Sequence, residues 1–253
     1  NPFAFVLPDG QRDPQGLFDL LSILQFGLVE IHRAQTSFSV SESQLVSAPL
    51  GGQNRREFPA GSHIILAQQP YSSFAKPLLE IQHYPELRQY PNGPLRRPYD
   101  VTAHTLGIQL GVETYQISDQ LEIPLERVEN LQVPNGNVKG KGRYWLFSHT
   151  NNAFARLSNR LLRAGHSVFW APNGFRSGGR GFPVGSLMAN VDDNVDISSL
   201  LAGLPVTIHR VSRRPDVAWQ SIHLPRIGLY KNFDPSIDEG WTRWILEQYE
   251  FSY

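Results

Sequence analysis

The strongest constraint on the fold of this chain is a short segment that occurs twice. The segment FPAGS at residues 58–62 recurs as FPVGS at residues 182–186, and an apolar run follows each copy, at 64–66 and 187–189. Because Pro-Xaa-Gly is typical of a tight turn, each copy predicts a turn that leads into a buried strand. The repeat therefore indicates two related halves with the same order of elements.

The first half begins with a β-α-β pattern. Apolar residues 3–7 predict a buried strand, and Asp13-Pro14 predicts the N-cap and first position of a helix that ends at Gly27. Residues 29–34 alternate apolar and polar side chains, which predicts the return strand. So short a connection favours a parallel pair of strands joined by a right-handed crossover.

The second half repeats this plan. Residues 144–147 predict a strand, and either Asn151 or Asn152 caps the helix that follows, which ends at Gly165. Residues 167–171 predict the return strand. Helices are also expected after the two apolar runs, at residues 72–81 and 197–201. We therefore predict an α/β fold of two related β-α-β halves with flavodoxin-like, doubly wound, mostly parallel sheets.

The predicted domain organisation follows from these elements and from shifts in composition. Residues 83–100 are rich in Pro, Tyr and Arg, and residues 132–143 are rich in Gly and Asn. In chain order, we expect a first α/β unit at 1–118 with an irregular Pro-rich segment at 83–100, a connector at 119–142, a second α/β unit at 143–223, and the start of a further element at 224–253, with a strand at 226–230 and a helix at 238–249.

Composition excludes several classes of function. The 253 residues include 23 Lys and Arg and 23 Asp and Glu, so the formal net charge is zero and favours neither nucleic acid nor an anionic membrane. No apolar stretch approaches the ~20 residues of a membrane-spanning helix, so we expect no membrane insertion. The chain has no cysteine, which excludes disulfides and cysteine nucleophiles.

Three long segments carry a resemblance to a known family. The segments are FPAGSHIILAQQPYSSFAKPLLE (58–80), YPNGPLRRPYDVTAHTLGIQLGV (90–112) and PRIGLYKNFDPSIDEGWTRWILEQY (225–249). They resemble the non-peptidase C-terminal region of bacterial zinc carboxypeptidase-like proteins. The resemblance implies a glutamine-amidotransferase-like α/β region, a secreted or periplasmic location, and a partner in the peptidase domain of the same parent protein.

The catalytic residues of that family do not transfer to this chain. Its zinc site needs an H-x-x-E motif and a second, distant His, because a catalytic zinc needs three protein ligands and an open position for water. The one literal match, His83-Tyr84-Pro85-Glu86, lies in the Pro-rich segment and does not match the family's zinc segment. We therefore expect no catalytic residue, no metal ligand and no cofactor in this chain, with zinc only in the peptidase domain.

Two further patterns point away from enzymatic sites. An amidotransferase needs a cysteine nucleophile, and no G-x-S-x-G elbow replaces it. In the Gly-rich segment 177–181, the nearest dinucleotide-binding spacing is Gly179, Gly181 and Gly185, which is one residue too long and leads into a strand. We expect the tip of a surface hairpin there.

Polar residues follow three predicted strands and are the candidates for ligand binding. In open α/β sheets, ligands bind beyond the carboxyl ends of the strands. The residues at those ends are Asp9, His149 with Asn151, and Lys231 with Asp234. The alternative is that they form caps and turns, as Asn and Asp commonly do.

Three functional hypotheses follow. The first is a non-catalytic accessory or structural region of a secreted zinc carboxypeptidase-like protein. The second is a module that binds a peptide, a cell-wall fragment or a small anion at the strand ends. The third is an independent hydrolase with an unrecognised site, which would need a cluster of perturbed ionisable groups in one cleft.

Overall fold

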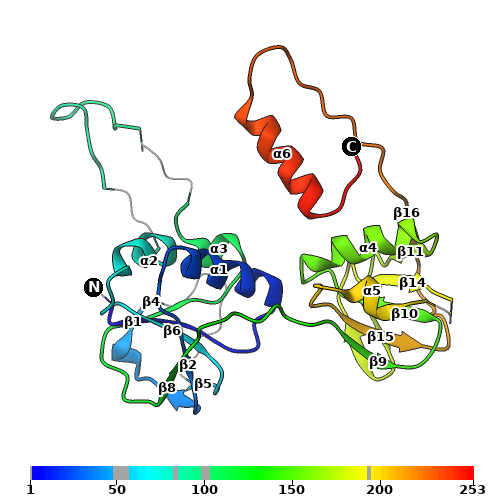
Figure 1. Cartoon of the computed structure of the whole chain (residues 1–253), viewed down its shortest axis with the longest axis horizontal. Helices are drawn as coiled ribbons and strands as arrows, with labels where there is room; N and C mark the ends of the chain where they lie inside the picture. The colour runs from blue at the N-terminus through cyan, green and yellow to red at the C-terminus, as the bar shows by residue number, and fades with distance from the viewer. Residues whose placement is uncertain (1, 48–56, 82–84, 98–102, 193–194) are drawn as a thin grey trace. The chain divides into compact units, whose positions relative to one another are not determined.

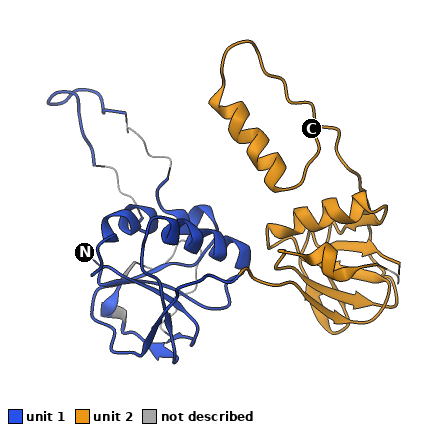
Figure 2. Cartoon of the chain, in the orientation of Figure 1, with its two compact units in different colours: residues 1–132 blue, residues 133–253 orange. Residues whose placement is uncertain are grey.

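The computed structural model describes residues 2–47, 57–81, 85–97, 103–192 and 195–253 (Figure 1). The chain divides into two compact units, unit 1 at Asn1–Gln132 and unit 2 at Val133–Tyr253 (Figure 2). The division falls inside the predicted connector 119–142, although that stretch also contributes one strand to each unit.

Unit 1 is built on a six-stranded sheet in the order β4-β7-β1-β6-β2-β8. The first helix begins as predicted, because Asp13 Oδ1 accepts hydrogen bonds from the backbone N–H groups of Gln15 and Gly16. The elements in chain order are β1 (Ala4–Leu7), α1 (Pro14–Phe26), β2 (His32–Ala34), β3 (Phe38–Ser39), the 3₁₀ turn η1 (Glu42–Gln44), β4 (Leu45–Ser47), β5 (Glu57–Phe58), β6 (His63–Leu66), α2 (Ser72–Leu79), α3 (Leu106–Gln109), β7 (Tyr115–Ile117) and β8 (Leu125–Arg127).

Unit 2 is built on a second six-stranded sheet, in the order β16-β11-β14-β10-β15-β9. The Gly-rich segment forms the tip of the β12–β13 hairpin, as its sequence predicts. The elements in chain order are β9 (Asn137–Gly140), β10 (Tyr144–Phe147), α4 (Ala153–Arg163), β11 (Ser167–Trp170), β12 (Phe175–Ser177), β13 (Arg180–Phe182), β14 (Leu187–Asn190), α5 (Ile197–Leu201), β15 (Thr207–Val211), β16 (Gln220–Ile222) and α6 (Ile237–Gln248).

The sheets correct the predicted strand arrangement. In unit 1, β6 lies between β1 and β2 and is antiparallel to both. In unit 2, β14 lies in the same way between β10 and β11. Each unit therefore has a split β-α-β arrangement, also called ferredoxin-like. Among the described strands only β9 and β15 pair in parallel. The mixed α/β class holds, but the adjacent parallel pair and the flavodoxin-like, mostly parallel sheets are wrong.

The repeat extends over five strands of each sheet, in the same register. Phe5 faces Ile65 on one side and Gln116 on the other, and Trp145 faces Ala189 and Arg210 in the same way. The outer strands β8 and β16 pair with β2 and β11 at matching positions. The β3–β5 and β12–β13 pairs correspond as well, because each contains a stacked pair of Phe rings, with centroids 5.1 Å and 5.0 Å apart.

Each sheet is covered on both faces. In unit 1, Phe5 and Ile65 pack with α1 and α2 on one face, whereas Val6 and Ile64 pack with the β3–β5 pair on the other. Unit 2 has the same two layers, with α4 on one face of its sheet and the β12–β13 hairpin on the other. Each unit therefore has a core on either side of its sheet, and its central strands are buried on both faces.

The C-terminal part of unit 2 differs from prediction in one element. Residues 223–236 form no strand, so the strand predicted at 226–230 is wrong, and most of these residues are exposed. The helix predicted at 238–249 forms as α6, Ile237–Gln248. Its start is capped by Ser236, whose Oγ accepts a hydrogen bond from the backbone N–H of Glu239. Among the described residues, no helix is long and apolar enough to cross a membrane.

The described part of the predicted Pro-rich segment, residues 85–97, contains neither helix nor strand. Arg88 and Leu95 form an isolated antiparallel bridge across it. The side chain of Arg88 also donates a hydrogen bond to the carbonyl of Gly93 at 2.8 Å. This part of the chain is an irregular loop closed by local contacts, as its composition predicts.

Candidate functional site

The predicted ligand-binding residues are divided between the two units. Asp9 is exposed after β1 of unit 1, and His149 is exposed at the corresponding position after β10 of unit 2. A Cβ added to Gly61 would lie 3.4 Å from Asp9, and one added to Gly185 would lie 3.1 Å from His149. The two residues therefore occupy equivalent turns, one in each unit.

Asn151 has a structural role instead of a ligand-binding one. Its Oδ1 accepts a hydrogen bond from the backbone N–H of Ala153 at 2.8 Å, and its Nδ2 donates to the carbonyl of Pro205 at 2.7 Å. The side chain is buried. Asn151 therefore caps α4 and ties it to the chain before β15, which resolves the choice between Asn151 and Asn152.

Lys231 and Asp234 lie in the exposed segment that precedes α6. Their selection rested on a strand at 226–230 whose carboxyl end would face a ligand, and that strand does not form. The prediction that they share a strand-end site is therefore wrong.

The possible zinc motif falls only partly within the described residues. His83 lies outside them, and Glu86 is an exposed residue that pairs with Arg88 at 3.3 Å. Over the parts of the chain that the structure describes, no group of three or more His, Cys, Asp and Glu side chains is close enough to hold a metal ion.

A buried histidine near Asp9 was not singled out from the sequence. His63 is 6% exposed, and its Nδ1 has no hydrogen-bond partner within the described structure. Burial, with the charge of Arg33, outweighs the opposing charge of Asp9 and lowers the pKa of His63 to about 4. His63 is therefore neutral at pH 7. The sequence does contain a sign of this residue: in the repeated segment, His63 of the first copy stands where the second copy has Leu187.

Ser62 beside it is fully engaged in the turn. Its Oγ accepts a hydrogen bond from the backbone N–H of Asp9 at 3.2 Å and donates one to the carbonyl of Pro59 at 2.7 Å. The hydroxyl therefore closes the turn after β5 and is not positioned as a nucleophile, in agreement with the absence of an elbow motif.

The most conspicuous surface feature is an apolar face on α6. Four side chains at helical spacing form it, and their exposed fractions are 78%, 61%, 53% and 50% for Ile237, Trp241, Trp244 and Ile245. The two indole rings meet edge to face with centroids 6.0 Å apart. We call these four residues the α6 apolar face. A contiguous exposed patch of this kind is typical of a surface that packs against another protein.

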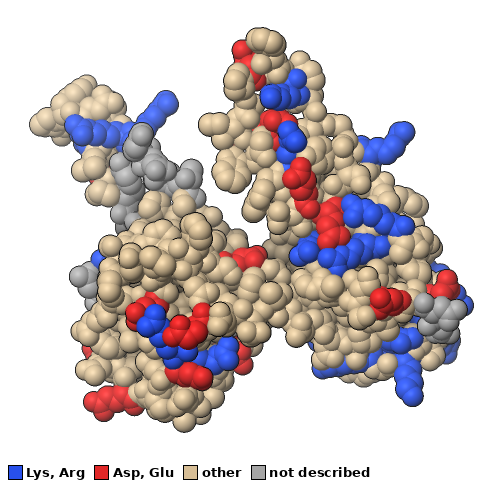
Figure 3. All heavy atoms as spheres, in the orientation of Figure 1, with Lys and Arg blue, Asp and Glu red and all other residues tan. Residues whose placement is uncertain are grey.

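A cluster of charges fastens the end of α6 to the rest of unit 2. The Glu250 carboxylate accepts hydrogen bonds from Arg160 at 2.7 Å and from Arg156 at 3.3 Å, and Arg163 lies 3.8 Å away. Asn159 donates a further bond to the carbonyl of Tyr249 at 2.9 Å. We call this cluster the Glu250 anchor. Figure 3 shows acidic side chains against a basic cluster over this part of unit 2.

The Glu250 anchor is electrostatically favourable in spite of its partial burial. Burial by itself raises the pKa of Glu250, but the hydrogen bonds and charge of Arg160, together with Arg156, lower it overall. Arg160 also donates to the carbonyls of Leu200 and Ala202, both at 2.9 Å. One arginine therefore links α4, α5 and the end of α6. The helical spacing of Arg156, Arg160 and Arg163 was the sequence signal for this cluster.

No family model, curated protein or solved structure matches this chain.

Proposed function

We propose that this chain is a non-catalytic accessory region of a secreted or periplasmic zinc carboxypeptidase-like protein, and that the α6 apolar face packs against the peptidase domain of that protein. The observation that carries the proposal is the exposure of Trp241 and Trp244 on a helix that is fastened to its own unit. Tryptophan is enriched among the residues that dominate binding energy at protein interfaces.

The Glu250 anchor supports this role because it orders the helix in advance. A helix of 12 residues is marginally stable by itself in water, and most helices depend on packing of an apolar face. The apolar face of α6 is turned to solvent, so contacts at its C-terminal end must hold it. A binding element that is ordered before it meets its partner loses less conformational entropy on association.

The resemblance to zinc carboxypeptidase-like proteins suggests the partner, which is the peptidase domain, and the reaction that this domain catalyses. Zinc and the catalytic residues belong, in this proposal, to the peptidase domain, and this chain contributes a surface and no cofactor. The α6 apolar face lies in the segment 225–249, which is one of the three that carry the resemblance.

The experiment is a binding titration between this chain and the separately purified peptidase domain of the parent protein, followed by calorimetry. The double variant W241A/W244A is expected to weaken association at least 100-fold, because central aromatic residues each contribute about 2 kcal/mol or more. Phe26→Ala is the matched control, because Phe26 is a 90% exposed aromatic residue of unit 1.

A third variant tests the anchor. Glu250→Gln leaves the α6 apolar face intact and is expected to weaken association about tenfold by loosening the helix. Equal affinities for the original chain and W241A/W244A, or the absence of any association, would contradict the proposal.

A ligand-binding module is the second candidate function, and one observation favours it. Unit 1 contains a hollow with a largely apolar lining and a lysine at its edge, and none of the strand-end residues predicted from the sequence lines it.

A further inference from the structure

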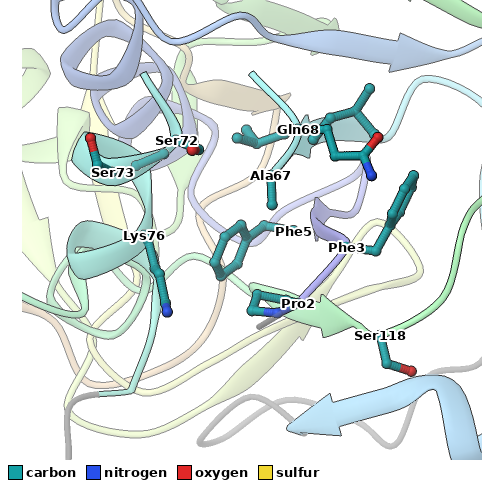
Figure 4. Close-up of a pocket in the computed structure, with 12 residues that line it drawn as sticks. Pro2, Phe3, Phe5, Ala67, Gln68, Ser72, Ser73, Lys76 and Ser118 are labelled. Atoms are coloured by element: carbon teal, nitrogen blue, oxygen red, sulfur yellow. The ribbon is translucent and has the colours of Figure 1, made fainter. Parts of the chain in front are cut away.

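Unit 1 has a hollow of about 520 Å³ beside α2, at the ends of β1 and β6 (Figure 4). Its lining is largely apolar, with a small number of polar groups, which is the usual composition of a small-molecule site. The residues that matter to its chemistry are Pro2, Phe3, Phe5, Ala67, Ser72 and Lys76.

Unit 2 has larger side chains at the corresponding positions of its sheet. In the shared register, Trp145 replaces Phe5, and Arg210 replaces Gln116. The Arg210 guanidinium lies 5.9 Å from the centre of the Trp145 ring, and Nε donates a 2.8 Å hydrogen bond to the carbonyl of Gly142. Gly142 precedes β10 as Pro2 precedes β1. The same strand register therefore carries a Trp and an Arg in contact with each other in unit 2, and a Phe that lines a hollow in unit 1.

The helices beside these two places also differ. In unit 2, Ile197 and Leu201 of α5 pack against the core that contains Trp145. In unit 1, α2 places Ser72, Ser73 and Lys76 around the hollow. Figure 4 shows Lys76 extending from α2 along the hollow on the side of Phe5 and Pro2. The hollow in unit 1 is thus lined by aromatic side chains and by the ammonium group of Lys76.

We propose that this hollow binds a small molecule with one carboxylate on an aromatic or branched apolar group. The apolar group lies against Phe5 and Ala67, and the carboxylate accepts hydrogen bonds from Lys76. The Lys76 side chain is 43% exposed and lies 3.7 Å from Glu80 in an i,i+4 pair. The Glu80 side chain is 22% exposed, and a helical i,i+4 ion pair of this length contributes little, so the ammonium group can turn to a ligand carboxylate.

The experiment uses the full chain with 3-phenylpropionate as the probe and 3-phenylpropanol as its neutral match. Calorimetry gives the affinities, and methyl NMR shifts at Ile65, Ala67 and Ala75 report the place of binding. Lys76→Met is expected to weaken binding of the carboxylate about tenfold and to leave binding of the alcohol unchanged. Lys141→Met, which removes an exposed lysine of unit 2, is the matched control and is expected to change neither affinity.

A second variant keeps the test decisive. Ala67→Phe is expected to fill the hollow and abolish binding of both probes, with unchanged methyl signals of Val6 and Ile64, on the other face of the unit 1 sheet, as evidence that unit 1 is folded. The absence of methyl shifts at millimolar probe, shifts in unit 2 only, or equal carboxylate affinity in Lys76→Met would each overturn the proposal. None of these readouts involves α6 or a peptidase domain, so this proposal and the proposed function fail separately.

Discussion

Unit 1 and unit 2 share one strand plan, yet they carry opposite charges. Unit 1 has 14 Asp and Glu against 9 Lys and Arg, whereas unit 2 has 9 against 14, so the net charge of zero conceals an acidic unit and a basic one. The apolar positions that set the register are kept in both. The shared strand order and register therefore depend on buried apolar residues along the central strands, whereas the charged surface residues differ between the units.

The differences reach into the helix-covered core. His63 of unit 1 lies opposite Leu7, and Leu187 of unit 2 lies opposite Phe147 at the same point of the register. The histidine is accepted there because burial keeps it neutral at pH 7. A core position can thus carry a titratable side chain in one copy and an apolar one in the other.

The largest effect is expected when the core of one unit is disrupted and the other unit is left unchanged. Leu20→Ala in unit 1 and Leu157→Ala in unit 2 each remove a side chain that is 0% exposed, at an expected cost of about 2–5 kcal/mol. Because each unit has its own cores, each substitution should lower the stability of one unit only. Hydrogen exchange of the amides in β6 and β14 measures this, and a loss of protection in both units from either variant would contradict it.

The second prediction concerns pH. The unfolded chain binds a proton at His63 with a pKa near 6.5, and the folded chain does so only at about 4, so the unfolded state binds more protons between these values. Unit 1 should therefore lose about 3 kcal/mol of stability as the pH falls from 7 to 4. His63→Leu, which copies unit 2, should remove this loss.

Urea unfolding at several pH values, followed by amide signals of unit 1, measures the effect. His149→Leu, which removes an exposed histidine of unit 2, is the control and should leave the pH dependence of unit 1 unchanged. The same dependence in His63→Leu as in the original chain would show that another group is responsible.

The smallest expected effect comes from placing in unit 2 the residue that unit 1 has at the same register position, Gln116. Arg210→Gln removes the hydrogen bond to Gly142 and the contact of the guanidinium with the Trp145 ring. The expected cost is about 1 kcal/mol, confined to unit 2. Urea unfolding followed by tryptophan fluorescence measures it, because all five tryptophans lie in unit 2. A gain in stability would mean that the arginine strains the sheet.

The sequence predicted the type of most elements but not how the strands pair. The residues of β1, AFVL, are all buried, and a continuous apolar run of this kind is typical of a parallel strand covered on both faces. Here the strand is antiparallel, and it is buried on both faces because the β3–β5 pair covers the side that the helices leave open. Local periodicity reports burial and cannot distinguish these two causes.

The same pairing decides what lies beside the candidate residues. In a parallel sheet the carboxyl ends of the strands meet at one edge, whereas in an antiparallel sheet neighbouring strands end at opposite edges. At the end of β1, Asp9 therefore lies near His63 at the start of the antiparallel strand β6, and not near the end of a parallel strand. For Asn151, the alternative of a helix cap was the correct one. The sequence predicted the helix α6. Whether one face of that helix is exposed depends on the elements that pack against it, and a local sequence pattern does not carry this information.

The Glu250 anchor is unbalanced in charge, since three arginines surround one carboxylate. The excess positive charge lies next to the C-terminal end of α6, and the α6 apolar face is exposed beside it. Charges beside an apolar contact surface attract an oppositely charged protein over a distance of about 10 Å and orient it before contact. In the proposed complex, added salt should therefore slow the association of α6 with the peptidase domain far more than it shortens the lifetime of the complex.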